Sequence, residues 1–481
     1  MKIFKNFFYN FSYQIFLLIV PLITTPYINR VIGPHGVGIN SYTSAIVIYF
    51  VLFGEIGLSM YGNREIAYVR DDRVKVTNTF WSIQLLRMIT ISISIIFYLF
   101  FAFFIAEKQN TVYYLLQGIT LFGALFDISW FFQGVENFRV TVTRNMIIKL
   151  LSIIAIFTFV KSASDLGLYL GLTSLSILLG NFTLWPYLKR YIGKPDFKHL
   201  HIFKHLKPSL VLFVPQIATQ VYMVLNRTML GQLDTITSSG YYFDADQIVK
   251  IVMSVSTAIV TVMLPRVANT FAEGNTKKVR FYVYRSFGFV NFLSIPMMFG
   301  LAAISLKFAP WFFGDKFVSV GPLIMWESPV IMIIGWSAVL GTQYLLPTGD
   351  NKSFTLSVTA GAILNLILNV PFILMWGALG AVSATVISEL LVAGYQLYVV
   401  KNEFDLKKLF LGYFKYFFSG IIMFIVVFML NTNLKFNAFY LIFEVFVGAI
   451  IYIAMNVFLK APVMMDIIKI GVKHLNGKNK G

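Results

Sequence analysis

The sequence predicts an all-α integral membrane protein with fourteen transmembrane helices in two repeated halves. Three observations lead to this prediction. The composition is 58% hydrophobic and only 12% charged, with a mean hydropathy of +0.75, whereas soluble proteins carry about 25% charged residues. Apolar runs long enough to cross a bilayer, about 20 residues each, recur along the whole chain. A weak internal repeat relates its first part to its second.

The apolar runs follow one another with short connections, none longer than about twenty residues. This spacing leaves no room for a soluble domain on either side, so any chemistry must lie within or between the helices. The fifth run is short, and only Trp376 and Gly377 separate the eleventh from the twelfth. The expected spans are residues 12–32, 39–60, 80–105, 112–133, 146–161, 167–188, 208–230, 242–263, 283–306, 321–345, 355–375, 378–400, 412–430 and 438–459.

The first span has features that a simple membrane anchor would lack. Pro21 and Pro26 interrupt it, and Arg30 lies near its far end. Each proline leaves a backbone carbonyl that needs another partner. An arginine at membrane depth costs about 2.5–3.5 kcal/mol on insertion scales. We therefore expect this helix to turn its polar atoms toward protein or a water-filled cavity.

The first span is echoed in the seventh. The segment 20–25 (Val-Pro-Leu-Ile-Thr-Thr) resembles the segment 214–219 (Val-Pro-Gln-Ile-Ala-Thr), and an arginine follows each copy, Arg30 and Arg227. Three further matches share an offset of 202 residues: Ile46-Val47 with Ile248-Val249, Arg64 with Arg266, and Lys75 with Lys277. Such internal symmetry is typical of transporters built from duplicated halves.

The charges predict that both termini are cytoplasmic. With the N-terminus inside, and with residues near the ends of spans counted with the adjoining segments, the inner segments hold 30 of the 39 Lys and Arg residues, the outer loops 5 and the spans 4. This bias sets orientation under the positive-inside rule. It also explains the net charge of +18 without nucleic-acid binding, because basic cytoplasmic loops lie beside anionic lipid.

Other classes are excluded by what the sequence lacks. No cysteine is present, which excludes disulfides, thiol catalysis and cysteine metal sites. No small-residue cleavage site follows the first apolar run, so we interpret that run as a span and not as a signal peptide. Phosphate-binding loops, serine elbows and zinc-protease motifs are also missing, which makes ATP-driven transport by this chain alone an unsuitable hypothesis.

Three ionisable residues share one depth in the first half. Glu55, Arg87 and Asp127 each lie five to seven residues from the expected inner end of a span, roughly 7–11 Å below the surface. They form either a coupling site for a proton or cation, or a structural ion network, because buried charges must pair wherever they occur.

A second charged group lies on the eighth span. Asp246 and Lys250 are spaced i, i+4 and so share a helix face, which favours a local ion pair and leaves a coupling role open. Asp244-Ala-Asp246 also has the Asp-x-Asp form with which some glycosyltransferases hold a metal. That motif would lie near the outer surface, where no sugar nucleotide is available.

Other polar residues have ordinary structural explanations. Asn365 and Asn369, one turn apart before Pro371, either line a polar pathway or bond to a neighbouring helix. His201 and His205 have a helical metal-ligand spacing in the inner loop 189–207, close to His199. Only Asp196 is near them as an acidic partner, so a solvated basic loop is a better interpretation than a zinc site. We expect no metal.

Four motifs resemble one family of transporters. The start of the chain, from Asn10 through Tyr13-Gln14-Ile15, Pro21 to Thr24, Pro26-Tyr27, Arg30 to Gly33, Gly36, Gly38 and Ser41-Tyr42, is similar to the start of bacterial polysaccharide repeat-unit flippases of the Wzx type. The segments 61–67 (Tyr-Gly-Asn-Arg-Glu-Ile-Ala), 127–138 (Asp-Ile-Ser-Trp-Phe-Phe-Gln-Gly-Val-Glu-Asn-Phe) and 347–352 (Pro-Thr-Gly-Asp-Asn-Lys) resemble further motifs of that family. The likeness is densest over residues 10–145 and continues to about 400.

The resemblance implies the fold of the multidrug/oligosaccharidyl-lipid/polysaccharide exporter superfamily, with two pseudo-symmetric six-helix lobes around a central cavity and two C-terminal helices. The corresponding segments here are 1–207, 208–405 and 406–481, the last ending in a basic cytoplasmic tail. The implied location is the bacterial plasma (inner) membrane, and the implied activity is outward movement of undecaprenyl-pyrophosphate-linked oligosaccharide by alternating access.

In this family, cavity arginines meet the pyrophosphate. Arginine suits phosphate because its guanidinium can bind two oxygens at once. We expect Arg30 and Arg227 at matching depth on opposite cavity walls, with snorkelling to the outer surface as the alternative. The other expected substrate-binding residues are Asn29, Gln216, Asn226 and Lys250, and the expected ion network is Glu55, Arg87, Asp127 and Asp246.

Alternatives of the same fold are a lipid II flippase and a drug/cation antiporter. A different class is a membrane enzyme, either a glycosyltransferase or the polysaccharide polymerase, but these usually need a large outer loop, and the longest here, about 307–320, is small. A passive scaffold does not explain arginines within spans. We expect no cofactor beyond a coupling H⁺ or Na⁺, and as partners bilayer lipids and a polysaccharide polymerase.

Overall fold

The computed structural model describes residues 2–195, 197–435 and 437–478 of the chain. It describes their side chains except at 2–11, 138, 139, 199, 214–216, 218, 219, 222, 223 and 471–478. Every regular element within these residues is helical. The chain divides into two compact units, residues 1–240 and 241–481.

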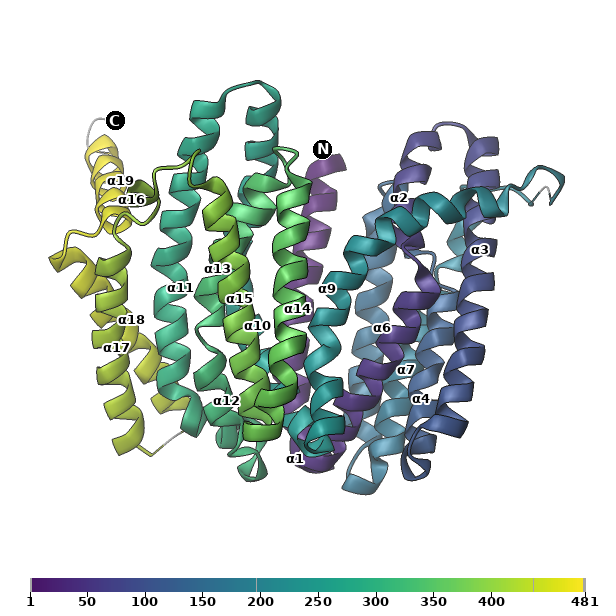
Figure 1. Ribbon diagram of the computed structural model, residues 1–481, viewed down its shortest axis with the longest axis horizontal. Coiled ribbons are helices and arrows are strands. Elements are labelled where there is room, and N and C mark those ends of the chain that lie inside the picture. The colour runs from purple at the N-terminus through teal and green to yellow at the C-terminus, as the bar shows by residue number, and fades with distance from the viewer. Residues whose placement is uncertain (1, 196, 436, 479–481) are drawn as a thin grey trace. The chain divides into compact units, whose positions relative to one another are not determined.

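The first unit is a bundle of long helices joined by short turns (Figure 1, purple to teal). Short 3-10 segments and one π-helical turn, η1 (Phe101–Ile105), connect them. Its α-helices are α1 (Lys2–Glu55), α2 (Leu58–Val69), α3 (Arg73–Phe100), α4 (Thr111–Leu125), α5 (Ser129–Gly134), α6 (Phe138–Phe159), α7 (Leu166–Phe182), α8 (Trp185–Leu188) and α9 (Leu206–Leu233).

The second unit is likewise a helix bundle (Figure 1, teal to yellow). Its first helix, α10 (Ile236–Ala272), begins within the first unit. The others are α11 (Thr276–Phe313), α12 (Val320–Glu327), α13 (Val330–Ser337), α14 (Asn351–Trp376), α15 (Ala378–Val400), α16 (Leu406–Leu409), α17 (Tyr413–Asn433), α18 (Ala438–Phe458) and α19 (Pro462–Lys478), with the π-helical η7 (Ala338–Leu345) after α13.

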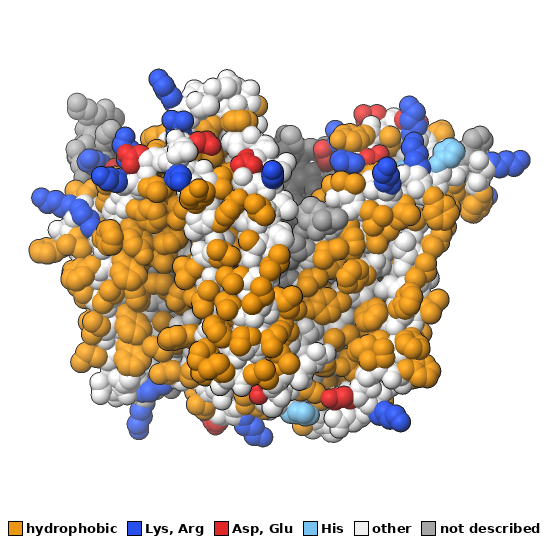
Figure 2. Space-filling model, in the orientation of Figure 1, with side chains coloured by type: hydrophobic (Ala, Val, Ile, Leu, Met, Phe, Trp, Pro, Cys, Tyr) orange, Lys and Arg blue, Asp and Glu red, His pale blue; other side chains and the backbone are white. Residues whose placement is uncertain are grey.

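Twelve helical segments among the described residues are long and apolar enough to cross a bilayer. They confirm the expected all-α membrane fold. In each unit, hydrophobic side chains cover the length of the helices on the face drawn in Figure 2, and most Lys and Arg side chains gather at one end of the bundle. That distribution is the one expected where a hydrocarbon layer surrounds the middle of each bundle.

The gap of residues 33–38 between the first two expected spans is shorter in the structure. Two helical segments meet at a kink at Gly33, whose φ of 71° lies in the left-handed region that glycine tolerates, and the chain is helical on both sides of it. Pro34 follows directly and removes one backbone donor. The bend divides α1 into a first arm before Gly33 and a second arm after it.

Two expected span ends also need correction. The second arm of α1 ends at Glu55 and not at 60, because Ile56 and Gly57 both have positive φ. The fourth span breaks between Leu125 and Ser129. Glu55 and Asp127 therefore lie at helix ends and not inside continuous helices.

The start of α10 packs closely on α1 within the first unit. A Cβ on Gly38 would lie 2.2 Å from the carbonyl oxygen of Ile236, and one on Gly240 would lie 2.7 Å from the backbone nitrogen of Gly38. The hydroxyl of Ser41 donates to the Ser239 carbonyl at 3.0 Å. Both glycines are needed because any side chain would push the two backbones apart.

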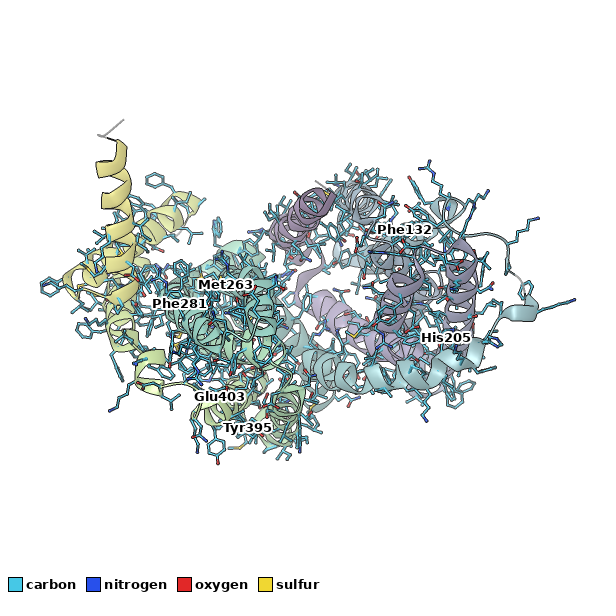
Figure 3. The ribbon with its side chains drawn as sticks, turned by 90° about the horizontal axis from the view of Figure 1, so that it is seen from above. Phe132, His205, Met263, Phe281, Tyr395 and Glu403 are labelled. Atoms are coloured by element: carbon cyan, nitrogen blue, oxygen red, sulfur yellow. The ribbon has the colours of Figure 1, made fainter. Side chains whose placement is uncertain are left out.

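Each unit has its own apolar core. In the first unit one cluster surrounds Trp130 and Phe80 and includes residues of α2, α3, α5 and α8, while a second surrounds Tyr98. In the second unit, one cluster surrounds Phe287 and another surrounds Tyr416. Seen down the helices in Figure 3, Phe132 and His205 belong to the first bundle, and Met263 and Phe281 lie on adjacent helices of the second.

Candidate functional site

The break after α4 is held by side chains from three other helices. The last carbonyls of a helix have no partner within it, and membrane hydrocarbon offers none. Here four successive carbonyls, those of residues 123–126, each accept a side-chain donor. The donors are Asn181 Nδ2 at 2.8 Å, Arg87 Nε at 2.9 Å, Gln84 Nε2 at 3.0 Å and Trp185 Nε1 at 2.9 Å, in the order of the carbonyls.

Arg87 also forms ion pairs with two acidic residues beside this break. Its Nη2 lies 2.5 Å from Glu55 Oε1 and 3.5 Å from Asp127 Oδ2, and its Nη1 donates to Ser59 Oγ at 2.8 Å. The Arg87 side chain is fully buried, whereas Glu55 and Asp127 are 27% and 20% exposed. The structure thus brings together the three residues that the sequence grouped by depth.

This geometry favours a structural role for Arg87. One guanidinium joins the end of α1, the start of α2 and the end of α4, and it supplies donors to polar groups of all three helices. Asp127 has a second contact of the same kind, because its Oδ1 accepts from the backbone nitrogen of Ser129 at the start of α5. A coupling role for these residues stays a prediction.

Arg30 lies one turn before the bend of α1. Its side chain is exposed, and its Nη1 donates to the carbonyl of Pro26 at 3.0 Å. It lies 18 residues from the start of the expected span at Ser12, or about 27 Å along the helix. Both expected arrangements, a cavity wall and the outer surface, are compatible with that depth.

Arg227 has a more enclosed setting. Its side chain is 9% exposed and within electrostatic range of Tyr49 on the second arm of α1. The next residue, Thr228, shares a hydrogen bond of 3.0 Å with the Tyr49 hydroxyl. The α9 helix therefore presents Arg227 beside α1, in the same unit as Arg30.

An Asn-Arg pair occurs in the first arm of α1 and again in α9. Asn29 precedes Arg30, and Asn226 precedes Arg227, and the two asparagines are 3% and 4% exposed. The two buried amides supply hydrogen-bonding groups next to each cation. The side chain of Gln216 lies outside the described residues. The expectation that the two arginines face each other across a cavity remains a prediction.

In the second unit, Lys250 Nζ lies 2.7 Å from Asp246 Oδ2. The sequence predicted this i, i+4 pair but missed its third member, Glu327 of α12, whose carboxyl lies within hydrogen-bonding reach of Asp246. One signal was present, because an acid six residues inside the expected span 321–345 needs a partner. In the structure Glu327 ends α12, and a break at Ser328 and Pro329 separates it from α13. Asn369 Nδ2 bonds to Asn365 Oδ1 at 2.8 Å, so these two amides pair within α14.

Arg144 of α6 is another buried cation that sequence reasoning missed. It is 8% exposed, and within the described part of the chain its Nε and Nη1 have no hydrogen-bond partner. Its Nη2 donates to Asn145 Oδ1. Arg144 lies between the expected spans 112–133 and 146–161, so the span pattern gave no reason to expect its burial.

The histidines of the inner loop have a structural explanation. His205 Nδ1 shares a hydrogen bond of 2.8 Å with the hydroxyl of Tyr61, and burial lowers the pKa of His205 below its usual value. Among the residues searched, no group of three His, Cys, Asp or Glu side chains could hold a metal ion.

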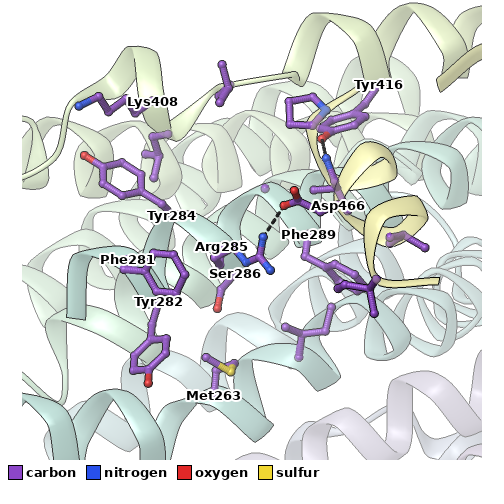
Figure 4. A pocket seen from close by; sticks show the side chains of 18 of the residues that line it. Met263, Phe281, Tyr282, Tyr284, Arg285, Ser286, Phe289, Lys408, Tyr416 and Asp466 are labelled. Atoms are coloured by element: carbon purple, nitrogen blue, oxygen red, sulfur yellow. Dashed lines mark hydrogen bonds and ion pairs between the residues drawn. The ribbon is translucent and has the colours of Figure 1, made fainter. Parts of the chain in front are cut away.

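A pocket of about 650 Å³ opens in the second unit, between α10, α11, α17 and α19. Its lining is mainly apolar, and Figure 4 shows the ion pair between Arg285 and Asp466 and the bond from the Val463 nitrogen to the Tyr416 hydroxyl. This lining suits a hydrocarbon chain better than a charged head group. None of the expected substrate-binding or ion-network residues lines it, although Arg266, a residue of the internal repeat, does.

Comparison with known proteins decides the family. The model of a family described as polysaccharide biosynthesis protein matches residues 3–271, more than half of the chain. The chain belongs to the polysaccharide biosynthesis protein family. A putative O-antigen transporter of Escherichia coli (strain K12) is 25% identical over 399 residues, which cover 80% of this polysaccharide biosynthesis protein and 93% of the relative.

Solved structures agree on the fold. The lipid II flippase MurJ in an inward closed conformation matches with a TM-score of 0.76 and 17% identity, over 95% of this chain and 99% of that one. An inward-facing multidrug resistance transporter of the MATE family and the MOP superfamily matches with a TM-score of 0.59 and 12% identity, over 81% and 94%. This polysaccharide biosynthesis protein therefore shares the fold of these two structures, and the twelve long apolar helical segments among its described residues are those expected of a multi-pass membrane protein.

Proposed function

We propose that this protein moves undecaprenyl-pyrophosphate-linked oligosaccharide repeat units from the inner to the outer leaflet of the bacterial plasma membrane, for cell-surface polysaccharide synthesis. The family match over residues 3–271 is the observation that carries the proposal. The O-antigen transporter relative supports the same substrate class.

The pyrophosphate is the difficult part of this substrate. Its lipid tail can stay in the bilayer, but an isolated anion in hydrocarbon costs tens of kcal/mol in the Born limit. Fixed cations beside a wet path offset that cost. The two Asn-Arg pairs, at 29–30 and 226–227, supply guanidinium groups with buried amides beside them, and we assign them to the pyrophosphate. Lys250 is a further cation for the head group.

Alternating access requires the helices to present these residues first to one side and then to the other. We propose fourteen spans with both termini cytoplasmic. The count of twelve treats α1 as one span although two were expected in it, and it does not include α9, which coincides with the expected span 208–230. The coupling ion is a proton or Na⁺, and a polysaccharide polymerase would take the product outside.

Two alternatives share the fold. A lipid II flippase carries the same pyrophosphate, whereas a drug/cation antiporter has no anion to bind and does not require paired arginines. An enzyme is less well supported, because the relatives are named as transporters.

Export of polysaccharide by variants tests the assignment. Arg30→Ala and Arg227→Ala should each abolish export at normal protein abundance, and lysine at either position should restore it only partly, because lysine lacks the two-pronged geometry. Arg73→Ala, at the exposed start of α3, is the matched control and should export normally. Wild-type export by the Arg30→Ala, Arg227→Ala double variant would contradict the assignment.

A further inference from the structure

Glu327 is a buried acid without an ordinary structural partner. Its side chain is 1% exposed, and its Oε2 has no hydrogen-bond partner among the described residues. It ends α12, seven residues after Val320, or about 10 Å along the helix. Burying a carboxyl group in a membrane span without a donor is costly, so its presence calls for an explanation.

Its nearest ionisable neighbour is another acid. The carboxyl of Glu327 lies within hydrogen-bonding reach of that of Asp246, and Asp246 is paired with Lys250 at 2.7 Å. Two carboxylates in direct contact repel each other when both are ionised, and a proton held between them would remove that repulsion. The contact itself therefore indicates a proton-binding pair.

The charged side chains that act most strongly on the Glu327 carboxyl are those of Asp246 and Lys250. Of the helices packed on α12, α15 carries Glu389, and α11 carries Lys307, whose Nζ donates to the carbonyls of Thr432 and Leu434. The α10 helix, which carries Asp246, also carries the buried Asp244. Glu327, Asp246 and Lys250 form one unit, which we call the Glu327 cluster.

The exposed fraction of the side chain increases from Glu327 through Asp246 to Lys250. Glu327 is 1% exposed, Asp246 is 17% exposed and Lys250 is 39% exposed. A lysine exposed within a span is expected to face water, since hydrocarbon would be costly. The cluster therefore leads from a water-facing cation through a carboxylate to a buried acid, which is the arrangement of a short proton relay.

We propose that the Glu327 cluster is the proton-binding site that couples transport to the proton gradient. Coupling rests on the flippase function proposed above. When Glu327 and Asp246 share a proton beside Lys250, the cluster has no net charge. Release of that proton to water leaves two carboxylates and one ammonium, with a net charge of −1.

This change of charge can bias the conformation. A neutral cluster can be enclosed by packed helices at little cost, whereas a cluster with a net negative charge favours a state in which water reaches it. Proton uptake from one side and release to the other would then follow the opening and closing of the second unit around α10 and α12.

Infrared difference spectroscopy of the purified full-length protein, between acidic and alkaline buffers, measures the shared proton without any lipid substrate. The wild type should lose the carbonyl band of a protonated carboxylic acid as the buffer becomes alkaline. Glu327→Gln should lack that band, and Asp246→Asn should shift it. Glu444→Gln is the matched control, because Glu444 is another fully buried acid of the same unit, paired with Asn431 at 3.0 Å. A Glu327→Gln spectrum identical to that of the wild type would overturn the proposal.

Polysaccharide export measures the coupling. At equal protein abundance, Glu327→Gln should lose export, Glu327→Asp should keep part of it because it retains a titratable group, and Glu444→Gln should export normally. Normal export by Glu327→Gln would refute coupling even if the infrared band were lost. Failure of the flippase function itself would appear differently, as no translocation of lipid-linked oligosaccharide by the wild-type protein in reconstituted vesicles, with the infrared band intact.

Discussion

Arg87 offers a sharp test of the structural account of the first unit. The change Arg87→Met keeps much of the side-chain volume but removes the charge and all five donors. It leaves the Glu55 carboxylate without its 2.5 Å partner, the carbonyl of Ala124 without its 2.9 Å donor and Ser59 Oγ without its 2.8 Å donor.

The expected cost follows from these contacts. Removing one partner of a buried ion pair costs about 3–5 kcal/mol. Because Glu55 and Asp127 are partly exposed and water can reach them, we expect the lower end, about 3 kcal/mol. The matched control is Arg64→Met, since the Arg64–Glu65 pair at 3.3 Å is exposed and should contribute less than about 1 kcal/mol.

A second substitution in the Arg87→Met variant compares the contributions of Glu55 and Asp127. Glu55→Gln in the Arg87→Met background removes the carboxylate that lay nearest to the Arg87 guanidinium and lost its partner. This second change should restore part of the stability. Asp127→Asn should restore less, because its contact with Arg87 is 3.5 Å and its Oδ1 also binds the Ser129 nitrogen. Thermal unfolding of the purified protein in detergent, followed by tryptophan fluorescence, measures all four variants.

Unfolding of Arg87→Met at the wild-type temperature would refute this reasoning. If stability and abundance were normal but polysaccharide export were lost, Arg87 would act in transport and not in the fold. Equal rescue by Glu55→Gln and Asp127→Asn would show that the distances of the two carboxylates from Arg87 do not rank their contributions to stability.

Three further predictions concern orientation, pH and packing. A cysteine at Ser164 should react with an impermeant maleimide on intact cells, and one at Asn275 only after permeabilisation; the reverse pattern would overturn the topology. Because burial lowers the pKa of His205, the stabilisation from its neutral form is present above its unfolded pKa, about 6.5, and is lost as the pH falls; replacement by Gln should remove this acid sensitivity from thermal unfolding. Gly38→Ala should destabilise by about 1–3 kcal/mol, because its Cβ would meet α10, whereas Gly394→Ala, with nothing within 4 Å, should not; equal unfolding temperatures would contradict this packing.

The sequence was sufficient for the membrane class and the helical fold, because length and hydropathy of a run decide whether it can cross a bilayer. The sequence was not sufficient to place the kink within α1 or the break after α4. The expected spans 12–32 and 39–60 left six residues between them, but a single positive φ at Gly33 is enough to turn α1. Donors from α3, α7 and α8 stabilise the end of α4, and no local pattern reveals such long-range partners.

The candidate site was predicted only in part, because local sequence patterns reveal partners on one helix but not partners on different helices. Pairs on one helix, such as Asp246 and Lys250, follow from spacing alone, and the common depth of Glu55, Arg87 and Asp127 was visible once spans were drawn. Glu327 could not be linked to Asp246, because their approach depends on how α12 packs within its unit.

Translocation in reconstituted vesicles tests the central claim most directly. The purified protein would be placed in liposomes with undecaprenyl-pyrophosphate-linked oligosaccharide, and a membrane-impermeant glycosidase outside would report the fraction of head groups that it can reach. We predict that wild-type vesicles expose the inner pool over time, while vesicles with the Arg30→Ala, Arg227→Ala variant expose only the outer pool. Equal exposure by the variant would contradict the pyrophosphate site, and no exposure beyond that of protein-free liposomes by the wild type would contradict the flippase assignment.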